Sequence, residues 1–329
     1  MRISFDKNNI SRRVGLAVGQ DERNLIVQTA TFYYHRGWTQ AQIAKKIGMS
    51  RPIVSRLLQK AKEEGIVEVF IKDEMVHTVT LEQQLENLFD LDEAVVAPTS
   101  HAQGYSLKSV VASAAASYVA KKTRNVNQLG ISWGTTVAEF VKWFPYEKRP
   151  NLHIVPLEGG MGRGFIDIHA NHLAYELAKK MQASCSYLYA PAIVDSEEMQ
   201  RHFNRILDVK TVLQEGAQTE MAIIGVGNPH EDSTLEKVGY LTVEDATSLR
   251  EAGAAGDVGF RFFDDAGVLV DHPFNERVVG VGFEQLKEIP TVIVIADGTH
   301  KLRSLKGILA SGMINVLIID EYSAAQLVK

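Results

Sequence analysis

The sequence predicts an α/β protein in which a small basic segment of three helices and a strand precedes a larger body with a mostly parallel sheet. Its 329 residues exceed the length that one hydrophobic core usually supports, which indicates two domains. After residue 93, strand-like and helical hydrophobic patterns alternate. Residues 1–72 hold 13 Lys and Arg against 6 Asp and Glu, although the whole chain has a net charge of -5. A basic segment ahead of an acidic body favours contact between that segment and a polyanion.

The composition is that of a folded globular protein. Apolar residues make up 45% of the chain and charged residues 23%, which excludes a disordered, collagen-like or coiled-coil chain. No apolar run approaches the roughly 18 residues of a membrane span, and residues 1–20 lack the apolar segment of a secretory signal. We therefore expect a cytoplasmic protein that does not bind membranes. The single cysteine, Cys185, excludes an internal disulfide.

The basic segment is predicted to form three helices, over residues 22–36, 40–47 and 51–64. In the first, apolar side chains recur at spacings of three and four. Gly37 and Gly48 end the first and second helices, where a residue with positive φ is common. Thr39 and Ser50 precede the second and third helices, where a hydroxyl is expected to cap the free N–H groups.

The second and third helices match the spacing of a helix-turn-helix. Ala44 falls where the two helices touch and only a small side chain fits, and Gly48 falls in the turn. Residues 66–72 alternate as a strand, which would add a wing. An unrelated pair of solvated helices would explain the charge but not these placements. The apolar residues expected to hold the pair against the first helix are Ile43, Ile47, Met49, Val54 and Leu57.

The outward face of the third helix carries side chains suited to a major groove. Arginine and glutamine side chains hydrogen-bond base edges, and lysines contact phosphates. We therefore expect this winged helix-turn-helix to bind double-stranded DNA. The candidate DNA-contacting residues are Thr39, Gln40, Lys45, Ser50, Arg51, Pro52, Ser55, Arg56, Gln59 and Lys60.

A predicted linker helix joins this segment to the body. Leu81, Leu85 and Leu88 form a narrow apolar stripe at helical spacing, too short for a coiled coil. The stripe indicates a helix that packs against either the body or a partner chain. The predicted domains are a DNA-binding domain over residues 1–74, a linker helix over 75–92, and a ligand-binding and oligomerisation domain over 93–329.

The body alternates short apolar strands with helices. Strands are predicted over residues 93–97, 128–132, 153–157, 186–190, 221–226, 291–296 and 315–319. Helices are predicted over residues 106–122, 135–143, 166–181, 195–207, 242–251, 302–311 and 323–328. This pattern predicts a mostly parallel sheet covered by helices on both faces, with ligands beyond the carboxyl ends of the strands.

Four strand ends carry residues suited to ligand binding. Residues 132–136, SWGTT, run into a helix start and supply free N–H groups, two hydroxyls and a glycine, as in an anion site. Residues 157–164, LEGGMGRG, form a flexible turn in which Glu158 is expected to accept hydrogen bonds from sugar hydroxyls. Residues 225–229 and 296–301 follow two further strands. Glycine at such a turn is often only turn geometry, but four such ends on one sheet edge favour a binding site.

The sequence lacks the motifs of common cofactors. After the strand at 221–226, GVG is followed by NPH, so the third glycine of a dinucleotide-binding G-x-G-x-x-G is missing. The ten histidines include no H-E-x-x-H metal motif. No set of Ser, His and Asp indicates nucleophilic catalysis. We therefore expect no cofactor, no metal and no catalytic residues.

Five stretches of the chain match a known family: FYYHRGWTQAQIAKKIGMSRPIVSRLL, GISWGTT, LEGG, AGDVGFRFFDDAG and HKLRSLKGILASGMINVLIIDEYSA. On these, residues 22–328 resemble the SorC-type (sorbitol-operon regulator) bacterial transcription factors. The resemblance implies an effector domain similar in fold to glucosamine-6-phosphate deaminase and ribose-5-phosphate isomerase, which binds a phosphorylated sugar without converting it. The implied phosphate-binding residues are Gly134, Thr135, Thr136 and Lys301, and the implied sugar-facing residues are Gly159, Gly160 and Asp257.

Glu158 departs from the family pattern. The position before Gly159 is basic in some relatives, where it meets a second phosphate or forms a Schiff base, and a carboxylate does neither. We therefore expect a ligand with one anionic end and a hydroxyl-rich body, with Arg163 as a further candidate contact.

The sequence thus predicts a DNA-binding regulator of a carbohydrate catabolic operon that responds to a phosphorylated sugar or sugar alcohol. A homodimer or homotetramer is expected, because a single head reads too few bases. Two alternatives stay open. One is a sugar-phosphate isomerase or deaminase with an accessory DNA-binding head, and the other is a regulator of unphosphorylated polyols.

Overall fold

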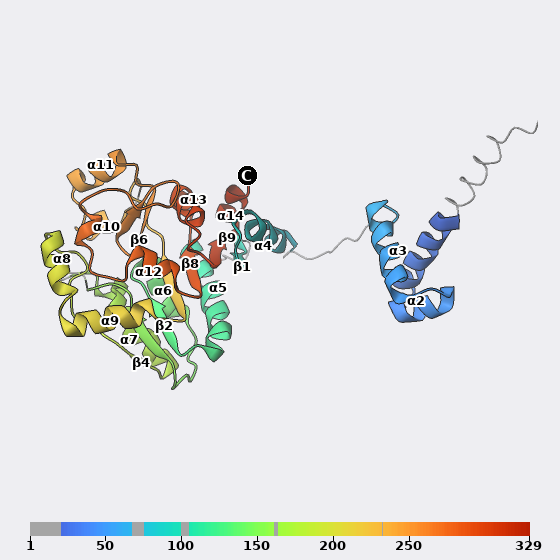
Figure 1. Ribbon diagram of the computed structural model, residues 1–329, viewed down its shortest axis with the longest axis horizontal. Helices are drawn as coiled ribbons and strands as arrows, with labels where there is room; N and C mark the ends of the chain where they lie inside the picture. Colours follow the sequence, from blue (N-terminus) through green and yellow to red (C-terminus); the bar gives the residue numbers. More distant parts are fainter. Residues whose placement is uncertain (1–20, 68–75, 100–104, 161–163, 232) are drawn as a thin grey trace, which may run out of the picture. The chain divides into compact units, whose positions relative to one another are not determined.

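A computed structural model describes residues 21–67, 76–99, 105–160, 164–231 and 233–329 (Figure 1). The chain divides between residues 73 and 74 into two compact units, which are described separately. Within the described ranges, no helix combines the length and the apolar character that a membrane crossing needs.

The first unit contains the predicted helices. Residues 21–30 form a helix that continues as a π-helical turn, η1 (Thr31–His35), and is followed by α2 (Gln40–Ile47) and α3 (Arg51–Glu63). The helix-turn-helix pair is present, and α2 begins and ends at the predicted residues. The buried apolar side chains of this unit are Ile26, Ala30, Phe32, Ile43, Ala44, Val54, Leu57, Leu58 and Ala61.

The caps of the two helices differ. Thr39 caps α2 as predicted, because its Oγ1 accepts from Gln42 N at 3.3 Å while Gln42 Oε1 accepts from Thr39 N at 2.9 Å. Ser50 stands before α3 but its side chain makes no cap hydrogen bond, since Pro52 has no N–H and Ile53 N donates to the Ser50 carbonyl. Met49 was expected in the core, but it is 36% exposed and lies outside it. The predicted wing lies mostly on residues 68–72, outside the described residues.

The second unit is built on a seven-stranded parallel sheet with the order β1-β9-β8-β5-β2-β3-β4. Its strands are β1 (Glu93–Ala97), β2 (Gln128–Ile131), β3 (His153–Pro156), β4 (Ser184–Cys185), β5 (Met221–Gly225), β8 (Val292–Ala296) and β9 (Val316–Asp320). A separate antiparallel hairpin consists of β6 (Gly256–Val258) and β7 (Arg261–Phe263). The predicted parallel α/β body is therefore confirmed.

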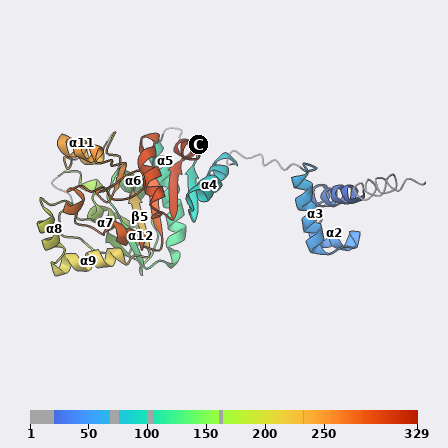
Figure 2. The same cartoon turned by 45° about the horizontal axis from the view of Figure 1, so that its top comes forward.

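Helices cover both faces of the sheet (Figures 1 and 2). One face is covered by α5 (Leu107–Lys122), α6 (Thr135–Trp143) and α7 (Ala170–Met181). The other face is covered by α4 (Val76–Phe89), α12 (Phe283–Lys287), α13 (Leu302–Ala310) and α14 (Glu321–Leu327). The remaining helical elements are η3 (Thr123–Asn125), η4 (Ile166–Ile168), α8 (Glu197–Phe203), α9 (Leu207–Ala217), α10 (Thr234–Lys237), α11 (Val243–Glu251), η5 (Asn275–Arg277) and η6 (Thr299–Lys301).

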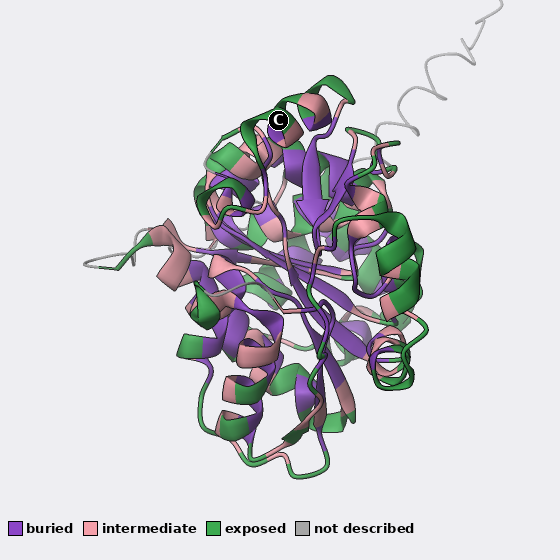
Figure 3. Cartoon of the chain, turned by 90° about the vertical axis from the view of Figure 1, so that its left-hand side faces the viewer, coloured by how far each residue is buried: buried purple, intermediate pink, exposed green. Residues whose placement is uncertain are grey.

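Buried strands explain the continuous apolar runs of the sequence. In β8, Val292 and Val294 point into the core on one side of the sheet, while Ile293 and Ile295 point into the core on the other. Figure 3 shows the buried residues gathered in the sheet and on the inner sides of the helices. Both faces of the strand must therefore be apolar.

The strand predicted over residues 186–190 is wrong. β4 ends at Cys185, and the backbone of Leu188 bonds to a side chain rather than to a strand. Leu188 N donates to Asn171 Oδ1 at 2.8 Å, and Asn171 Nδ2 donates to Leu188 O at 3.0 Å. Leu188 and Ala190 are buried in a small cluster with Val209 of α9. The apolar alternation there reflects the packing of an irregular segment.

The predicted linker helix, α4, packs against the body. Leu81 and Leu85 are buried in the core, whereas Leu88 is 56% exposed. The outer edge of β1 also depends on α4, because Glu86 Oε1 accepts from Ala94 N at 3.0 Å and Glu82 Oε1 accepts from Val96 N at 2.9 Å. Two glutamates thus satisfy N–H groups that an edge strand would otherwise leave free.

The order of the strands creates a switch point. From β2 the chain continues outward through α6 to β3, whereas from β5 it continues in the opposite direction to β8. The carboxyl ends of the neighbouring strands β2 and β5 therefore border a crevice, which is the usual ligand position in such sheets.

Candidate functional site

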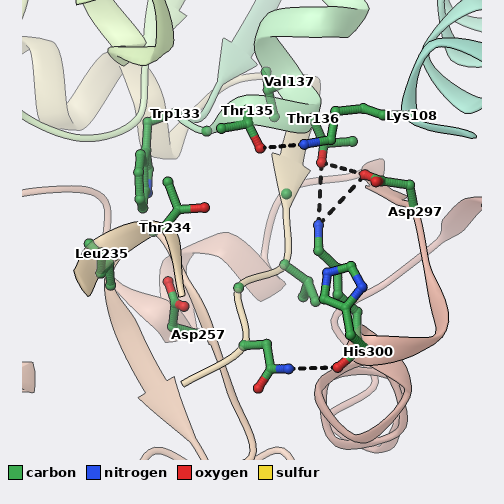
Figure 4. Close-up of a pocket in the computed structure, with 17 residues that line it drawn as sticks. Lys108, Trp133, Thr135, Thr136, Val137, Thr234, Leu235, Asp257, Asp297 and His300 are labelled. Carbon is green, nitrogen blue, oxygen red and sulfur yellow. Dashed lines mark hydrogen bonds and ion pairs between the residues drawn. The ribbon is translucent and has the colours of Figure 1, made fainter. Parts of the chain in front are cut away.

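A cavity of about 160 Å³ lies at this switch point (Figure 4). Its walls come from the ends of β2, β5 and β8, from the start of α5, from α10 and from the hairpin. The lining residues are Lys108, residues 133–137, residues 225–228, Thr234, Leu235, Asp257, Gly259, Asp297, His300 and Lys301.

The turn between β2 and α6 presents a helix start to the cavity. Gly134 has a φ of 122°, which favours glycine, and α6 begins at Thr135. The first N–H groups of a helix have no partner inside it, and the helix dipole adds positive potential at that end. Gly134 N donates to the Ile168 carbonyl at 2.9 Å, so Thr135 and Thr136 supply the N–H groups that this helix start offers to an anion.

Each threonine of this turn accepts a hydrogen bond from a lysine (Figure 4). Lys301 Nζ donates to Thr136 Oγ1 at 3.3 Å, and Thr136 Oγ1 donates to Asp297 Oδ1 at 2.7 Å. Lys108 Nζ donates to Thr135 Oγ1 at 2.9 Å. Two ammonium groups and two hydroxyls from α5, α6 and η6 thus meet at one end of the cavity.

Burial decides the ionisation of the charged groups. The side chain of Lys301 is 12% exposed and its Nζ lies 3.7 Å from Asp297 Oδ1. Burial lowers the pKa of Lys301, and Asp297 partly offsets this effect. Burial raises the pKa of Asp257 to about 7, although Lys301 opposes the rise. Near neutral pH, the Asp257 carboxyl can therefore donate a hydrogen bond in its protonated form and accept one in its ionised form.

The hairpin supplies an aromatic wall. Gly259 and Phe260 join β6 to β7 as a two-residue turn with φ values of 53° and 68°. This conformation is strained for Phe260, whose ring stacks on Trp133 with the ring centroids 4.4 Å apart. Because Trp133 lines the cavity, the cavity has an apolar wall beside its charged groups.

Gly227 makes room for Asp257. A Cβ at Gly227 would lie 1.9 Å from Asp257 Oδ1, and Gly227 N donates to the Asp257 carbonyl at 2.9 Å. The next residue, Asn228, donates from Nδ2 to the His300 carbonyl at 2.6 Å. The end of β5 is therefore tied both to the hairpin and to the turn after β8.

The structure brings together five of the nine predicted effector residues: Gly134, Thr135, Thr136, Asp257 and Lys301. Glu158, Gly159 and Gly160 do not line the cavity. Gly159 is packed so closely that a Cβ would lie 2.6 Å from the carbonyl oxygens of Ala190 and Pro191. Arg163 lies outside the described residues.

Glu158 is buried behind the hairpin turn. It is 1% exposed, and its Oε1 accepts from Ser132 Oγ at 2.8 Å. Its Oε2 has no hydrogen-bond partner in the described part of the chain. Burial raises the pKa of Glu158 to about 7, against the hydrogen bond from Ser132 and the charge of Arg261. Gly259, which lines the cavity, packs so closely on this carboxyl that a Cβ there would lie 2.6 Å from Glu158 Oε1.

Several lining residues are not among the predicted effector residues. Asn228, Asp297 and His300 belong to strand ends that the sequence marks, and their position after a strand was the available signal. Lys108 and Thr234 carry no such signal, because only the fold brings α5 and α10 to the cavity. Across the described ranges, no cluster of three His, Cys, Asp or Glu side chains is arranged to hold a metal ion.

On the first unit, the candidate DNA contacts of α3 are exposed. Arg51, Pro52, Ser55 and Arg56 share the face away from the core, and Lys45 is exposed on α2. Neither arginine forms an ion pair with any residue that the structure describes. Their guanidinium groups are therefore available to bases or phosphates.

Other candidates on this unit already have partners. Gln59 Nε2 donates to Glu63 Oε1 at 2.9 Å. Lys60 Nζ lies 2.5 Å from Glu22 Oε1 and 3.7 Å from a Glu64 oxygen, and the Glu22 hydrogen bond raises the pKa of Lys60. The Thr39 hydroxyl caps α2, and Gln40 is half-buried.

Two protein families match this chain. Residues 73–329 match the family described as "Putative sugar-binding domain". Residues 26–76, which include the helix-turn-helix, match a family described as "Putative ATPase subunit of terminase (gpP-like)". That stretch contains no G-x-x-x-x-G-K sequence for nucleotide phosphates.

Curated relatives and solved structures resemble most of this chain. It is 29% identical to the deoxyribonucleoside regulator of Bacillus subtilis (strain 168), over 94% of this chain and 98% of the relative. The structure of the full-length sorbitol operon regulator SorC from Klebsiella pneumoniae is 31% identical, with a TM-score of 0.74, over 94% of this chain and 100% of that one. A DeoR family transcriptional regulator from Listeria monocytogenes is 38% identical, with a TM-score of 0.71, over 76% of this chain and 99% of that one.

These relatives are transcriptional regulators and not enzymes, which favours regulation over the isomerase or deaminase alternative. The seven-stranded sheet, the helix-turn-helix and the sugar-binding match over residues 73–329 agree with that class. The chain belongs to the SorC family of sugar-binding transcriptional regulators and is a sugar-responsive transcriptional regulator.

Proposed function

We propose that this regulator controls a carbohydrate catabolic operon and that its effector is a phosphorylated sugar or sugar alcohol bound in the cavity of the body. The observation that carries the proposal is the pairing of the α6 start with Lys301. Backbone N–H groups, a threonine hydroxyl and an ammonium group converge on one small volume. Such a set suits a phosphate group better than a neutral hydroxyl.

The other end of the cavity suits a sugar body. Asp257 offers a carboxyl that exchanges hydrogen bonds with hydroxyls, and Trp133 offers an aromatic face. A ligand with one anionic end and several hydroxyls would use both. The resemblance adds Gly159 and Gly160 as proposed sugar-end residues, and the sequence itself adds Glu158 and Arg163. Contact between Glu158 and the ligand requires a local rearrangement, because Glu158 is 1% exposed and does not line the cavity.

We propose that α3 reads operator DNA in the major groove, with Arg51, Ser55 and Arg56 at base edges and Lys45 on a phosphate. The exposure of these side chains supports this assignment. A single α3 contacts only a few base pairs, so we propose a homodimer or homotetramer that reads repeated half-sites. Sedimentation of the full chain with and without operator DNA tests this, and a monomer on DNA would contradict it.

A thermal-shift screen of sugar phosphates, each paired with its free sugar, tests the effector class. A ligand that binds only the folded chain raises the melting temperature by mass action. We expect a phosphorylated compound to raise it at concentrations where the free sugar has no effect. The second candidate is an unphosphorylated polyol, favoured by the name of the sorbitol operon regulator. Equal shifts from both members of a pair would favour the polyol.

A further inference from the structure

Lys108 lines the cavity beside Lys301 and differs from it in its partners. It lies in the first turn of α5 and reaches Thr135 Oγ1, whereas Lys301 reaches Thr136 Oγ1. Lys301 is paired with Asp297, but Lys108 has no carboxylate within ion-pair distance in the described part of the chain. The two ammonium groups lie close enough that the charge of Lys108 lowers the pKa of Lys301. The lining thus holds one ammonium charge that Asp297 does not balance.

The two threonines also differ in the hydrogen bonds that their hydroxyls can still offer to a ligand. The Thr136 hydroxyl donates its hydrogen to Asp297, so it has none left for a ligand. The Thr135 hydroxyl accepts from Lys108 and keeps its own hydrogen. An ammonium group has three N–H donors, and the hydrogen bond to Thr135 uses one of those on Lys108. Thr135 and Lys108 therefore both keep donors that a ligand at this end of the cavity can use (Figure 4).

We infer that Lys108 is a specificity-determining residue, a second cationic ligand that makes the cavity select a doubly charged oxyanion over a singly charged one. A phosphate monoester is such a dianion, whereas a sugar acid or a sulfonate carries one charge. This inference rests on the proposed function, because it assumes that the anionic end of the effector occupies the Gly134-Thr135-Thr136 turn. Lys301, which is paired with Asp297, positions the anion, and the ammonium group of Lys108 attracts an oxyanion of two negative charges more strongly than an oxyanion of one.

The inference is tested by titrating the full-length chain with inorganic phosphate and with methanesulfonate, a tetrahedral oxyanion of one charge, at a pH where phosphate is mainly the dianion. Thermal shift over a concentration series gives the affinity of each anion. Lys108→Gln should lower the affinity for phosphate by about tenfold or more, since it removes a charge-assisted hydrogen bond. It should weaken methanesulfonate binding by a clearly smaller factor, because one negative charge is attracted less strongly than two. Lys108→Arg keeps the charge and should retain most of the preference for phosphate.

Lys121→Gln is the matched control, because Lys121 is an exposed residue in the last turn of the same helix. It should leave both affinities unchanged. Equal weakening of the two anions by Lys108→Gln would overturn the inference, as would an unchanged affinity for phosphate. Phosphate binding that Lys301→Ala abolishes and Lys108→Gln preserves would remove the role of Lys108 alone. Absence of phosphate binding in the unsubstituted chain would overturn the proposed phosphate site together with this inference.

Discussion

The indole of Trp133 lies flat on the phenyl ring of Phe260, with the ring centroids 4.4 Å apart and the ring planes 5° from parallel. Trp133 precedes the turn that begins α6, and Phe260 stands at the tip of the β6–β7 hairpin. The stack therefore joins the anion end of the cavity to the wall that carries Asp257. Phe260 holds a φ of 68°, and the contact with Trp133 compensates that strained conformation.

Phe260→Ala should destabilise the body. The ring is fully buried, and its removal leaves a cavity, so the free energy of unfolding should fall by about 3–5 kcal/mol. Urea unfolding followed by tryptophan fluorescence measures the loss. Phe165→Ala is the control, because Phe165 is 58% exposed and its removal should have little effect. Equal stability of the two variants would contradict the structural importance of the stack.

Lys301→Ala should lower the affinity for the phosphorylated effector but not the affinity for its free sugar. The buried ammonium group offers a charge-assisted hydrogen bond worth about 1.5–3 kcal/mol, which corresponds to tenfold or more in affinity. Isothermal titration should show this loss for the phosphorylated form and hardly any change for the free sugar. DNA binding without effector should survive. If both forms weaken equally, Lys301 does not bind the phosphate and the polyol alternative becomes the better one.

Glu158→Gln should change how stability depends on pH. Burial raises the pKa of Glu158 from an ordinary 4.5 to about 7, so the folded chain holds this proton more tightly than the unfolded chain. The group therefore stabilises the fold below pH 4.5, and that contribution is lost as the pH rises through 7. As the pH rises from 4.5 to above 7, the free energy of unfolding of the unsubstituted chain should fall by about 3 kcal/mol relative to that of the Gln variant.

Urea unfolding over a pH series measures this difference. Asp257 also has a raised pKa, and its charge contributes to the raised pKa of Glu158, so the difference between the two proteins includes this coupling. Glu251→Gln, an exposed substitution at the end of α11, should instead show a constant offset from the unsubstituted chain. A constant offset for Glu158→Gln as well would mean that Glu158 is not buried as described.

On the DNA-binding unit, Arg56→Ala and Lys45→Ala should have different effects. Loss of a base contact at Arg56 should cost about 1–3 kcal/mol of operator affinity and relax specificity at one base pair. Loss of a phosphate contact at Lys45 should weaken binding to all DNA sequences alike. It should also reduce the slope of the logarithm of affinity against the logarithm of salt concentration by about one. Lys60→Ala should cost less, because Glu22 and Glu64 already neutralise this lysine. Fluorescence anisotropy on a selected operator and on random DNA distinguishes the three.

A chain of residues 74–329 should fold and respond to effector without the DNA-binding unit, whereas residues 93–329 should not fold stably. The difference is α4, which buries Leu81 and Leu85 and covers the edge of β1 through Glu82 and Glu86. Thermal unfolding with and without effector compares the two chains. A longer chain that aggregates, or a shorter one of equal stability, would contradict the role assigned to α4.

The sequence by itself determined the elements whose signals are local. Thr39 and Gly48 bound α2 because a cap and a residue with positive φ act within one turn of the backbone. The apolar runs of β5, β8 and β9 predicted buried parallel strands, since both faces of such strands need apolar residues. The rule that ligands lie beyond the carboxyl ends of strands then led to the SWGTT turn and to Lys301.

Only the tertiary structure decided what depends on contacts between distant segments. Lys108 lies 27 positions before Thr135, and nothing in its neighbourhood marks it as a cavity residue. Residues 186–190 alternate like a strand, but the Asn171 side chain bonds the Leu188 backbone and the segment stays irregular. Glu158 follows a strand end as ligand residues do, yet the β6–β7 hairpin covers it, because that hairpin packs Phe260 on Trp133 and sets Gly259 against the carboxyl.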